Sequence, residues 1–141
     1  MPKGSYGNLK LAKKNAKLLM KKTDCDAVKI ESNKKNFKII KFLVKHKIPV
    51  MGHIGFTPQF KKKFKIEGNS KKKAEKLLNE AKNIEKAGAF SIVLECIYPE
   101  ASKLITNSLK IPTIGIGSSN NCDGQILVTD DMLGISGFYP K

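Results

Sequence analysis

The sequence is organised by a regular alternation between short apolar runs and longer segments in which apolar residues recur at helical spacing. This spacing predicts helices over residues 8–23, 33–47, 71–89 and 99–110. The short runs, which predict strands, cover residues 26–31, 48–55, 90–96, 111–118 and 124–130. Strands that alternate with helices and are apolar almost throughout indicate a parallel sheet covered by helices.

The faces and ends of the expected helices support this order of elements. We expect three apolar stripes to face the core, and they comprise Leu9, Ala12, Ala16, Leu19 and Met20, then Phe37, Ile40, Leu43 and Val44, then Ala74, Leu77, Leu78, Ala81 and Ile84. Ser70 stands where an N-cap is expected, and Gly88 stands where glycine commonly ends a helix. Asp130 and Asp131 predict a turn or the start of a helix.

No segment of low complexity divides the chain, which predicts a single domain over residues 1–141. A parallel α/β domain is either an open doubly wound sheet or a (β/α) barrel. The sequence contains neither the dinucleotide-binding turn GxGxxG nor a P-loop, which weakens the case for a nucleotide-binding sheet. The "GIGSS" stretch after the fourth expected strand is a weak signal by itself.

The net charge of +15 raises the question of nucleic-acid binding. All 27 basic residues are lysines, however, whereas arginine supplies the planar fork that reads phosphates and guanine edges. The lysines are spread over several helix surfaces, and their densest group, "FKKKFK" (60–65), falls in a loop-like stretch. We therefore expect solvated surfaces and a general compositional bias; salt-dependent binding of DNA or RNA is the contrasting hypothesis.

Three cysteines, Cys25, Cys96 and Cys122, lie far apart and form no CxxC pair, which predicts free thiols in a reducing cytoplasm. The first ten residues lack the apolar core of a signal peptide, and no apolar run approaches the length that spans a membrane. We expect a cytoplasmic protein that does not contact a membrane.

Polar side chains stand at the carboxyl ends of three successive expected strands. Lys29 and Glu31 share one face of the first strand, because side chains two positions apart point the same way. His53 ends the second strand in "MGHIG", and Glu95 ends the third in "IVLEC". Parallel α/β folds place their sites at these strand ends, and burying an unpartnered polar group costs about 2–7 kcal/mol. The pattern predicts a site in which Glu95 is a candidate general base.

Three of these residues also have a structural interpretation. Lys29 and Glu31 would form an ion pair at the rim of the sheet, and His53 would be a hydrogen-bonded part of the scaffold. Glu95 is harder to explain in this way, because it follows an apolar run and has no cation next to it in the sequence.

Five motifs resemble, in order and spacing, those of the ketopantoate hydroxymethyltransferase (3-methyl-2-oxobutanoate hydroxymethyltransferase) family: "VKIE", "PVMGHIGFTPQ", "IVLEC", "IPTIGIGS" and "DGQILVTDDMLGI". The opening "MPKGSY" looks like the segment after this family's third barrel strand. The resemblance implies a partial (β/α)8 TIM barrel, approximately strands 4–8 with their helices. It also implies hydroxymethyl transfer from 5,10-methylenetetrahydrofolate to 3-methyl-2-oxobutanoate, giving 2-dehydropantoate in pantothenate biosynthesis, with Mg²⁺ as the metal.

Carried over by motif, the resemblance implies a function for each polar residue at the strand ends. Glu31 of "KIE" matches a carboxylate of the magnesium site, Lys29 matches a residue that contacts the 2-oxo acid, and Glu95 matches the proton acceptor. His53 of "GHIG" matches a histidine near the substrate, and its role stays open. Because the family forms large homo-oligomers, the expected partners are the 2-oxo acid, the folate, and either further copies or a complementing N-terminal half.

The chain departs from the family pattern at both ends, where the family's first three strands and its final helix would stand. Two aspartates of the magnesium site belong to that missing part. Residues 68–70 ("GNS") also lack the arginine usual after this glycine, and Ser119 replaces a common glycine. Three hypotheses remain: a transferase that is inactive as an isolated chain, a non-catalytic remnant or subunit, and another Mg²⁺-dependent enolate enzyme of the phosphoenolpyruvate/isocitrate-lyase-like group.

Overall fold

The computed structural model describes residues 1–32 and 36–137 and has the predicted alternation of helices and strands. In chain order the elements are α1 (Leu9–Thr23), β1 (Val28–Glu31), α2 (Phe37–Lys45), β2 (Val50–Gly55), α3 (Lys71–Lys86), β3 (Ser91–Glu95), α4 (Pro99–Ser108), β4 (Thr113–Ile116), β5 (Gly124–Gln125) and α5 (Thr129–Met132). The strands form one parallel sheet in the order β1-β2-β3-β4-β5. Consecutive parallel neighbours joined by helices are the arrangement of a (β/α) barrel, and here helices join the first four of the five strands, whereas a loop joins β4 to β5.

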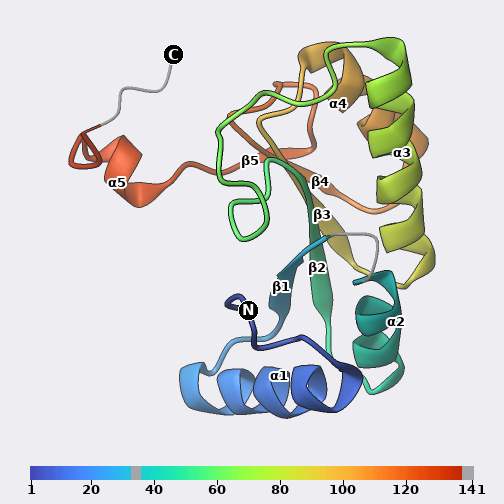
Figure 1. Ribbon diagram of the computed structural model, residues 1–141, viewed down its shortest axis with the longest axis vertical. Coiled ribbons are helices and arrows are strands. Elements are labelled where there is room, and N and C mark those ends of the chain that lie inside the picture. The colour runs from blue at the N-terminus through green and yellow to red at the C-terminus, as the bar shows by residue number, and fades with distance from the viewer. Residues whose placement is uncertain (33–35, 138–141) are drawn as a thin grey trace.

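The helices lie on one side of the sheet and leave the other side open. Figure 1 shows α2, α3 and α4 together on one side, with α1 at the β1 end and α5 beyond β5. We call the helix-covered side the outer face and the opposite side the inner face. Side chains of Val28, Ile30 and Ile92 lie in the helix-covered core, so the alternate positions along the strands face inward.

Close packing of α3 against β2 depends on Gly52. A Cβ atom at this position would lie 2.4 Å from Cγ2 of Ile84, a fully buried side chain of α3. The absence of a side chain at Gly52 lets the helix approach the strand. A glycine in the middle of an apolar strand here marks a close approach of another element to the backbone and not the end of the strand.

The helix ends largely follow the sequence. The side chain of Asn8 caps α1 by accepting a hydrogen bond from the Leu11 amide at 2.9 Å. Ser70 occupies the N-cap position of α3, but its hydroxyl makes no capping hydrogen bond within the described residues. Gly88 has a φ of +92° just beyond α3, the left-handed conformation that commonly ends a helix. Asp130 and Asp131 lie in the first turn of α5, at the predicted helix start.

Two predictions about the apolar positions were wrong. Leu9 is 40% exposed, because it stands in the first turn of α1 and lines a surface cavity instead of facing the core. The strand predicted over residues 124–130 ends at Gln125, since β5 has a neighbour on one side only and the chain turns into α5 at Thr129. Residues 33–35 of the predicted second helix lie outside the described residues.

Two further expectations concern the whole chain. Cys25, Cys96 and Cys122 are free thiols, as predicted. Within residues 1–32 and 36–137, none of the helices combines the length and the apolar character needed to cross a membrane.

We predict that Gly52→Ala lowers the free energy of unfolding by about 1–3 kcal/mol, because the new methyl group overpacks the contact between β2 and Ile84. Urea denaturation of purified protein measures the change. The matched control is Gly7→Ala, where an added Cβ meets no atom within 4 Å. Equal stability losses in the two variants would contradict the proposed contact.

Candidate active site

The register of the sheet brings the four predicted site residues to the same face. Glu31 of β1 is the register partner of His53 in β2, and Lys29 is the partner of Met51, two positions before His53. Glu95 of β3 is the partner of Gly55, two positions after His53. Side chains of register partners and of residues two positions apart point the same way in a parallel sheet, so Lys29, Glu31, His53 and Glu95 all belong to the inner face.

His53 and Glu95 come into direct contact on this face. The Nε2 atom of His53 lies 2.9 Å from Oε2 of Glu95, and the side chains are 1% and 19% exposed, respectively. The distance is that of an ion pair, but the orientation gives neither ring nitrogen of His53 a hydrogen bond within the described residues. The distance places an imidazole beside a partly accessible carboxylate.

Gly55 allows β2 and β3 to close tightly beside this pair. Its φ is +93°, and a Cβ atom there would lie 2.1 Å from the carbonyl oxygen of Glu95. The next amide, that of Phe56, donates a hydrogen bond of 2.8 Å to the same carbonyl. Gly55 therefore lets the chain leave the strand, and the hydrogen bond from the Phe56 amide holds the backbone of Glu95 in place.

Glu31 is buried and held by Gln59, which Tyr6 holds in turn, and the sequence alone singled out neither residue. Its Oε2 accepts a hydrogen bond of 2.9 Å from the backbone amide of Gln59, and the Gln59 side-chain oxygen accepts one of 2.8 Å from the Tyr6 hydroxyl. Burial, together with the negative charge of Glu31, raises the pKa of Tyr6 to about 12, so the hydroxyl stays protonated and can donate. Gln59 lies in the quoted motif "PVMGHIGFTPQ" and Tyr6 in "MPKGSY", but neither motif reveals that the two residues meet.

The alternative of an ion pair between Lys29 and Glu31 is wrong. Lys29 is exposed, and its ammonium group forms no ion pair within the described residues. Glu31, in contrast, is buried beneath the Gln59 amide. Lys29 is thus a free positive charge on the inner face, near the buried carboxylate.

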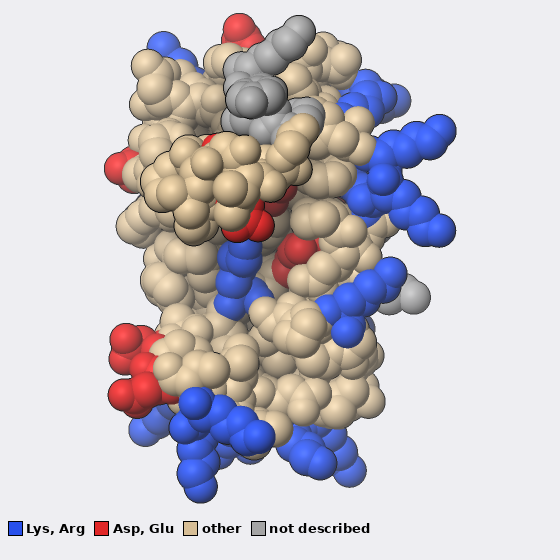
Figure 2. All heavy atoms as spheres, turned by 90° about the vertical axis from the view of Figure 1, so that its left-hand side faces the viewer, with Lys and Arg blue, Asp and Glu red and all other residues tan. Residues whose placement is uncertain are grey.

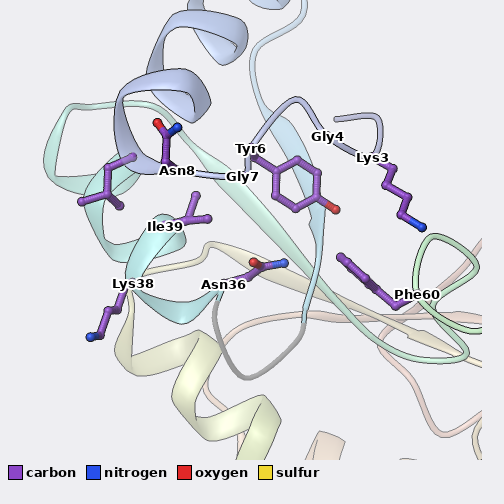
Figure 3. Close-up of a pocket in the computed structure, with 10 residues that line it drawn as sticks. Lys3, Gly4, Tyr6, Gly7, Asn8, Asn36, Lys38, Ile39 and Phe60 are labelled. Carbon is purple, nitrogen blue, oxygen red and sulfur yellow. The ribbon is translucent and has the colours of Figure 1, made fainter.

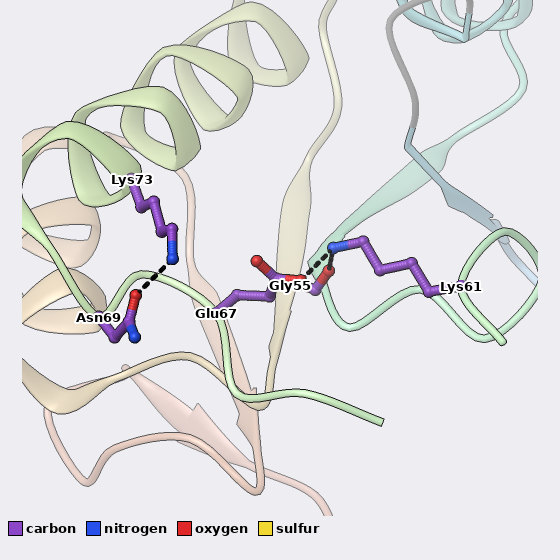
Figure 4. Close-up of polar contacts among 5 residues, drawn as sticks. All are labelled: Gly55, Lys61, Glu67, Asn69 and Lys73. Carbon is purple, nitrogen blue, oxygen red and sulfur yellow. Dashed lines mark hydrogen bonds and ion pairs between the residues drawn. The ribbon is translucent and has the colours of Figure 1, made fainter. Parts of the chain in front are cut away.

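The loop over residues 56–70 is tied to the carboxyl ends of the strands (Figure 4). The ammonium group of Lys61 donates to the carbonyl oxygen of Gly55 and to Oε1 of Glu67, both at 2.7 Å. The Glu67 amide in turn donates to the carbonyl of Cys96, just beyond β3. Lys61, one of the clustered lysines, is therefore a structural contact that keeps this loop beside the strand ends.

A cavity of about 400 Å³ lies beside Tyr6 at the beginnings of α1 and α2 (Figure 3). Its lining includes the rings of Tyr6 and Phe60, the amide of Asn36, and the lysines Lys3 and Lys38. A cavity of this size that combines aromatic and cationic groups suits a planar ligand with negative charge.

Among residues 1–32 and 36–137, no three His, Cys, Asp or Glu side chains come together to hold a metal ion. Mg²⁺ takes an octahedral set of oxygen ligands and usually binds through one or two carboxylates together with substrate and water. Glu31 offers one such carboxylate. The described residues therefore fit part of a magnesium site and do not complete one.

The inner face has charged side chains of both signs at its centre and lysines around its margin. In Figure 2, which views the open side of the sheet, lysines gather around the margin, whereas uncharged atoms form most of the middle with a few acidic and basic side chains among them. On this face, therefore, most lysines lie at the margin, and charges of both signs lie together at the centre.

We predict that Tyr6→Phe lowers the free energy of unfolding by about 1–3 kcal/mol, because it removes a buried hydrogen bond and leaves the Gln59 oxygen without its donor. Urea denaturation measures the loss. Tyr98→Phe is the control, since Tyr98 is exposed and its hydroxyl makes no hydrogen bond within the described part of the chain. A loss no greater than that of the control would rule out the Tyr6–Gln59 contact.

We predict that Cys96 reacts with iodoacetamide at a rate that still rises about tenfold per pH unit between about pH 8 and pH 10. Burial and the neighbouring Glu95 carboxylate raise its pKa to about 11, and only the thiolate reacts, so the reactive fraction grows until the pH reaches that value. Peptide mapping by mass spectrometry follows the rate. An unstructured cysteine peptide, with a pKa of about 8.5, should level off earlier. A plateau for Cys96 near pH 9 would contradict the burial of its thiol.

Comparison with solved structures supports the partial barrel. The chain is similar to dihydrodipicolinate synthase from Acinetobacter baumannii, with a TM-score of 0.59 and 15% sequence identity over 97% of this chain and 57% of that one. The Agrobacterium tumefaciens dihydrodipicolinate synthase gives a TM-score of 0.53 at 12% identity, over 99% of this chain and 48% of that one. At these identities the likeness shows the fold alone: these neighbours are TIM-barrel enzymes, and the chain is a barrel-like part of that fold.

Comparison with known sequences shows the family. The family model for ketopantoate hydroxymethyltransferase matches residues 1–141. Relatives named 3-methyl-2-oxobutanoate hydroxymethyltransferase are 51% identical over 96% of the chain in Pelagibacter ubique (strain HTCC1062) and 50% identical over 100% in Campylobacter curvus (strain 525.92). The matches cover 53% and 54% of those relatives, so the chain spans about half their length. The chain belongs to the ketopantoate hydroxymethyltransferase family.

Proposed function

We propose that this chain supplies the general base of a 3-methyl-2-oxobutanoate hydroxymethyltransferase, which forms 2-dehydropantoate for pantothenate biosynthesis. The observation that carries the proposal is the Glu95 carboxylate beside His53, on the same inner face as Glu31 and Lys29, in a chain of this family. Because the chain spans about half the length of its relatives, the reaction is proposed for the complete barrel to which these residues contribute.

The proposed chemistry begins with a proton transfer to Glu95. The carboxylate removes the proton from carbon 3 of the 2-oxo acid, and the electron pair of that C–H bond forms an enolate. Hydrolysis of 5,10-methylenetetrahydrofolate breaks both bonds from its methylene carbon to the folate nitrogens, gives each nitrogen one proton of the water and frees that carbon as formaldehyde with the water oxygen. The enolate carbon attacks the formaldehyde carbon, and the new alkoxide takes the proton from Glu95 to become the hydroxyl group. The partial exposure of Glu95, 19%, leaves its carboxylate within reach of a substrate on the inner face.

Two neighbours of Glu95 support this step. The His53 ring lies 2.9 Å from the carboxylate and limits the positions that it can take. Lys29 is exposed on the same face, and we assign to it the neutralisation of the carboxylate of the 2-oxo acid or of the developing charge of the enolate.

The magnesium proposal rests on Glu31. When bound, Mg²⁺ would polarise the carbonyl of the 2-oxo acid and make the neighbouring C–H bond more acidic. Glu31 would supply one oxygen ligand, oriented by the hydrogen bond from the Gln59 amide, and the other protein ligands would come from outside the described residues.

The cavity beside Tyr6 is our candidate site for the folate. The ring of Phe60, which is 41% exposed, can stack on a planar ring, and Lys3 and Lys38 offer positive charge to its carboxylates. The three free thiols support the further proposal that the protein works in the reducing cytoplasm.

We predict that Glu95→Gln slows proton exchange at carbon 3 by about 10²–10⁴-fold, because the amide cannot accept the proton. The protein for this test is a chimaera in which residues 1–141 replace the matching segment of the Pelagibacter ubique relative, so that the whole length of the relative is present. Proton NMR follows the exchange of the carbon-3 hydrogen of 3-methyl-2-oxobutanoate for deuterium, and hydroxymethyl transfer is assayed separately with the folate added.

Glu100→Gln is the matched control, since this glutamate is exposed in the first turn of α4, and it should leave exchange unchanged. Exchange by Glu95→Gln at the rate of the parent chimaera would rule out Glu95 as the base. A folded parent chimaera without exchange or transfer would favour the non-catalytic hypothesis.

A further inference from the structure

We propose that Tyr6 and Gln59 are positioning residues for the Glu31 carboxylate and that they strengthen Mg²⁺ binding at Glu31 without touching the metal. This role rests on the proposed function of Glu31 as a magnesium ligand. Tyr6 acts through Gln59, and the contacts that link the three residues join separate parts of the chain.

The peptide unit that follows Glu31 is fixed at both of its polar groups. The side-chain amide of Asn36, a buried residue, donates a hydrogen bond of 2.8 Å to the Glu31 carbonyl oxygen. The backbone amide of Ser32 donates one of 2.8 Å to the carbonyl oxygen of His53 in β2. The freedom that remains to Glu31 therefore lies in the rotation of its side chain.

That side chain is held at one of its two oxygens. Oε2 of Glu31 accepts a hydrogen bond of 2.9 Å from the Gln59 amide, whereas Oε1 has no hydrogen bond or ion pair within residues 1–32 and 36–137. Glu31 is 5% exposed, and a single neutral donor compensates poorly for the water that a buried carboxylate loses. A divalent cation at Oε1 would supply the missing compensation, since Mg²⁺ binds carboxylate oxygens.

The side chain of Gln59 fixes the backbone amide that holds Glu31. Its Nε2 group donates a hydrogen bond of 3.1 Å to the Met1 carbonyl oxygen, and its Oε1 atom accepts one of 2.8 Å from the Tyr6 hydroxyl. A backbone carbonyl can only accept, so the side-chain amide must turn its NH₂ group to Met1 and its oxygen to Tyr6. In Figure 3 the Tyr6 hydroxyl points toward the loop that carries Phe60, the residue after Gln59.

Tyr6 is a rigid support for this contact. Its side chain is 5% exposed and belongs to the hydrophobic core, so the ring has little freedom to move away from Gln59. Burial and the negative charge of Glu31 raise the pKa of the hydroxyl to about 12, which keeps the donor protonated at neutral pH. Removing groups that orient metal ligands through hydrogen bonds typically weakens metal binding by about 10–100-fold.

The test measures Mg²⁺ binding to the chimaera with the Pelagibacter ubique relative by isothermal titration calorimetry. We expect Tyr6→Phe to weaken binding by about tenfold, because the Gln59 amide is no longer fixed against Glu31. Gln59→Leu keeps the backbone amide but removes both side-chain hydrogen bonds, and it should cause a similar loss. The double variant should lose no more than Gln59→Leu alone, because Tyr6 acts only through that side chain.

Thr106→Val is the matched control for a loss of stability without a change at Glu31. It removes a hydrogen bond of 2.9 Å between the hydroxyls of Thr106 and Thr113, at the amino end of β4, and should leave the Mg²⁺ affinity unchanged. An equal loss of affinity in this control would overturn the positioning role, because lower stability alone would then explain the effect. Additive losses in the double variant would overturn it as well.

Glu31→Gln separates the positioning role from the proposed function. Unchanged Mg²⁺ affinity in Glu31→Gln would overturn the magnesium role of Glu31, on which the positioning role rests. Weaker binding in Glu31→Gln together with unchanged binding in Tyr6→Phe and Gln59→Leu would overturn the positioning role alone.

Nitrogen-15 relaxation of this chain by itself tests the same contacts without metal, and it replaces calorimetry if the chimaera fails to fold. In Tyr6→Phe and in Gln59→Leu, the order parameter of the residue-59 amide should fall from about 0.85, typical of rigid backbone, toward about 0.6. The amides of the central strand β3 should stay unchanged. A residue-59 amide as rigid in both variants as in the parent chain would overturn the positioning role.

Discussion

The parallel register of β1, β2 and β3 is the constraint on which the rest of the structure depends. It sets Glu31 opposite His53 and Glu95 opposite Gly55, so that every second side chain at the strand ends belongs to the inner face. A shift of one residue would exchange the two faces of a strand and turn these polar groups into the helix-covered core. The apolar residues at the alternate positions, such as Ile30 and Ile92, oppose that shift because they fill the core.

Two glycines of β2 make this register compatible with close packing on both sides. Gly52 lets α3 approach the outer face, where Ile84 occupies the space of an absent side chain. Gly55 lets the chain turn away at the strand end and brings the Phe56 amide onto the carbonyl of Glu95. His53 lies between these glycines, and its ring is 1% exposed beside the Glu95 carboxylate.

Much of the fold and part of the candidate site could be predicted from the sequence. The positions of the four polar residues follow from strand ends and from a period of two, and all four lie on one face. The apolar pattern was misleading at Leu9 and beyond Gln125, because periodicity reports an apolar stripe and not whether another element is present to cover it. Gln59 and Tyr6 were missed for a different reason: their hydrogen bond joins residues 53 positions apart in the chain.

By itself the sequence determined the order of helices and strands, the family, and the inward direction of Lys29, Glu31, His53 and Glu95, because these depend on local periodicity and on short motifs. Only the tertiary structure decided that His53 meets Glu95, that Gln59, itself bonded by Tyr6, holds Glu31, and that Lys29 forms no ion pair within the described residues. These contacts depend on how strands and loops that are distant in the sequence pack against one another. The spacing of side chains along one strand carries no information about that packing.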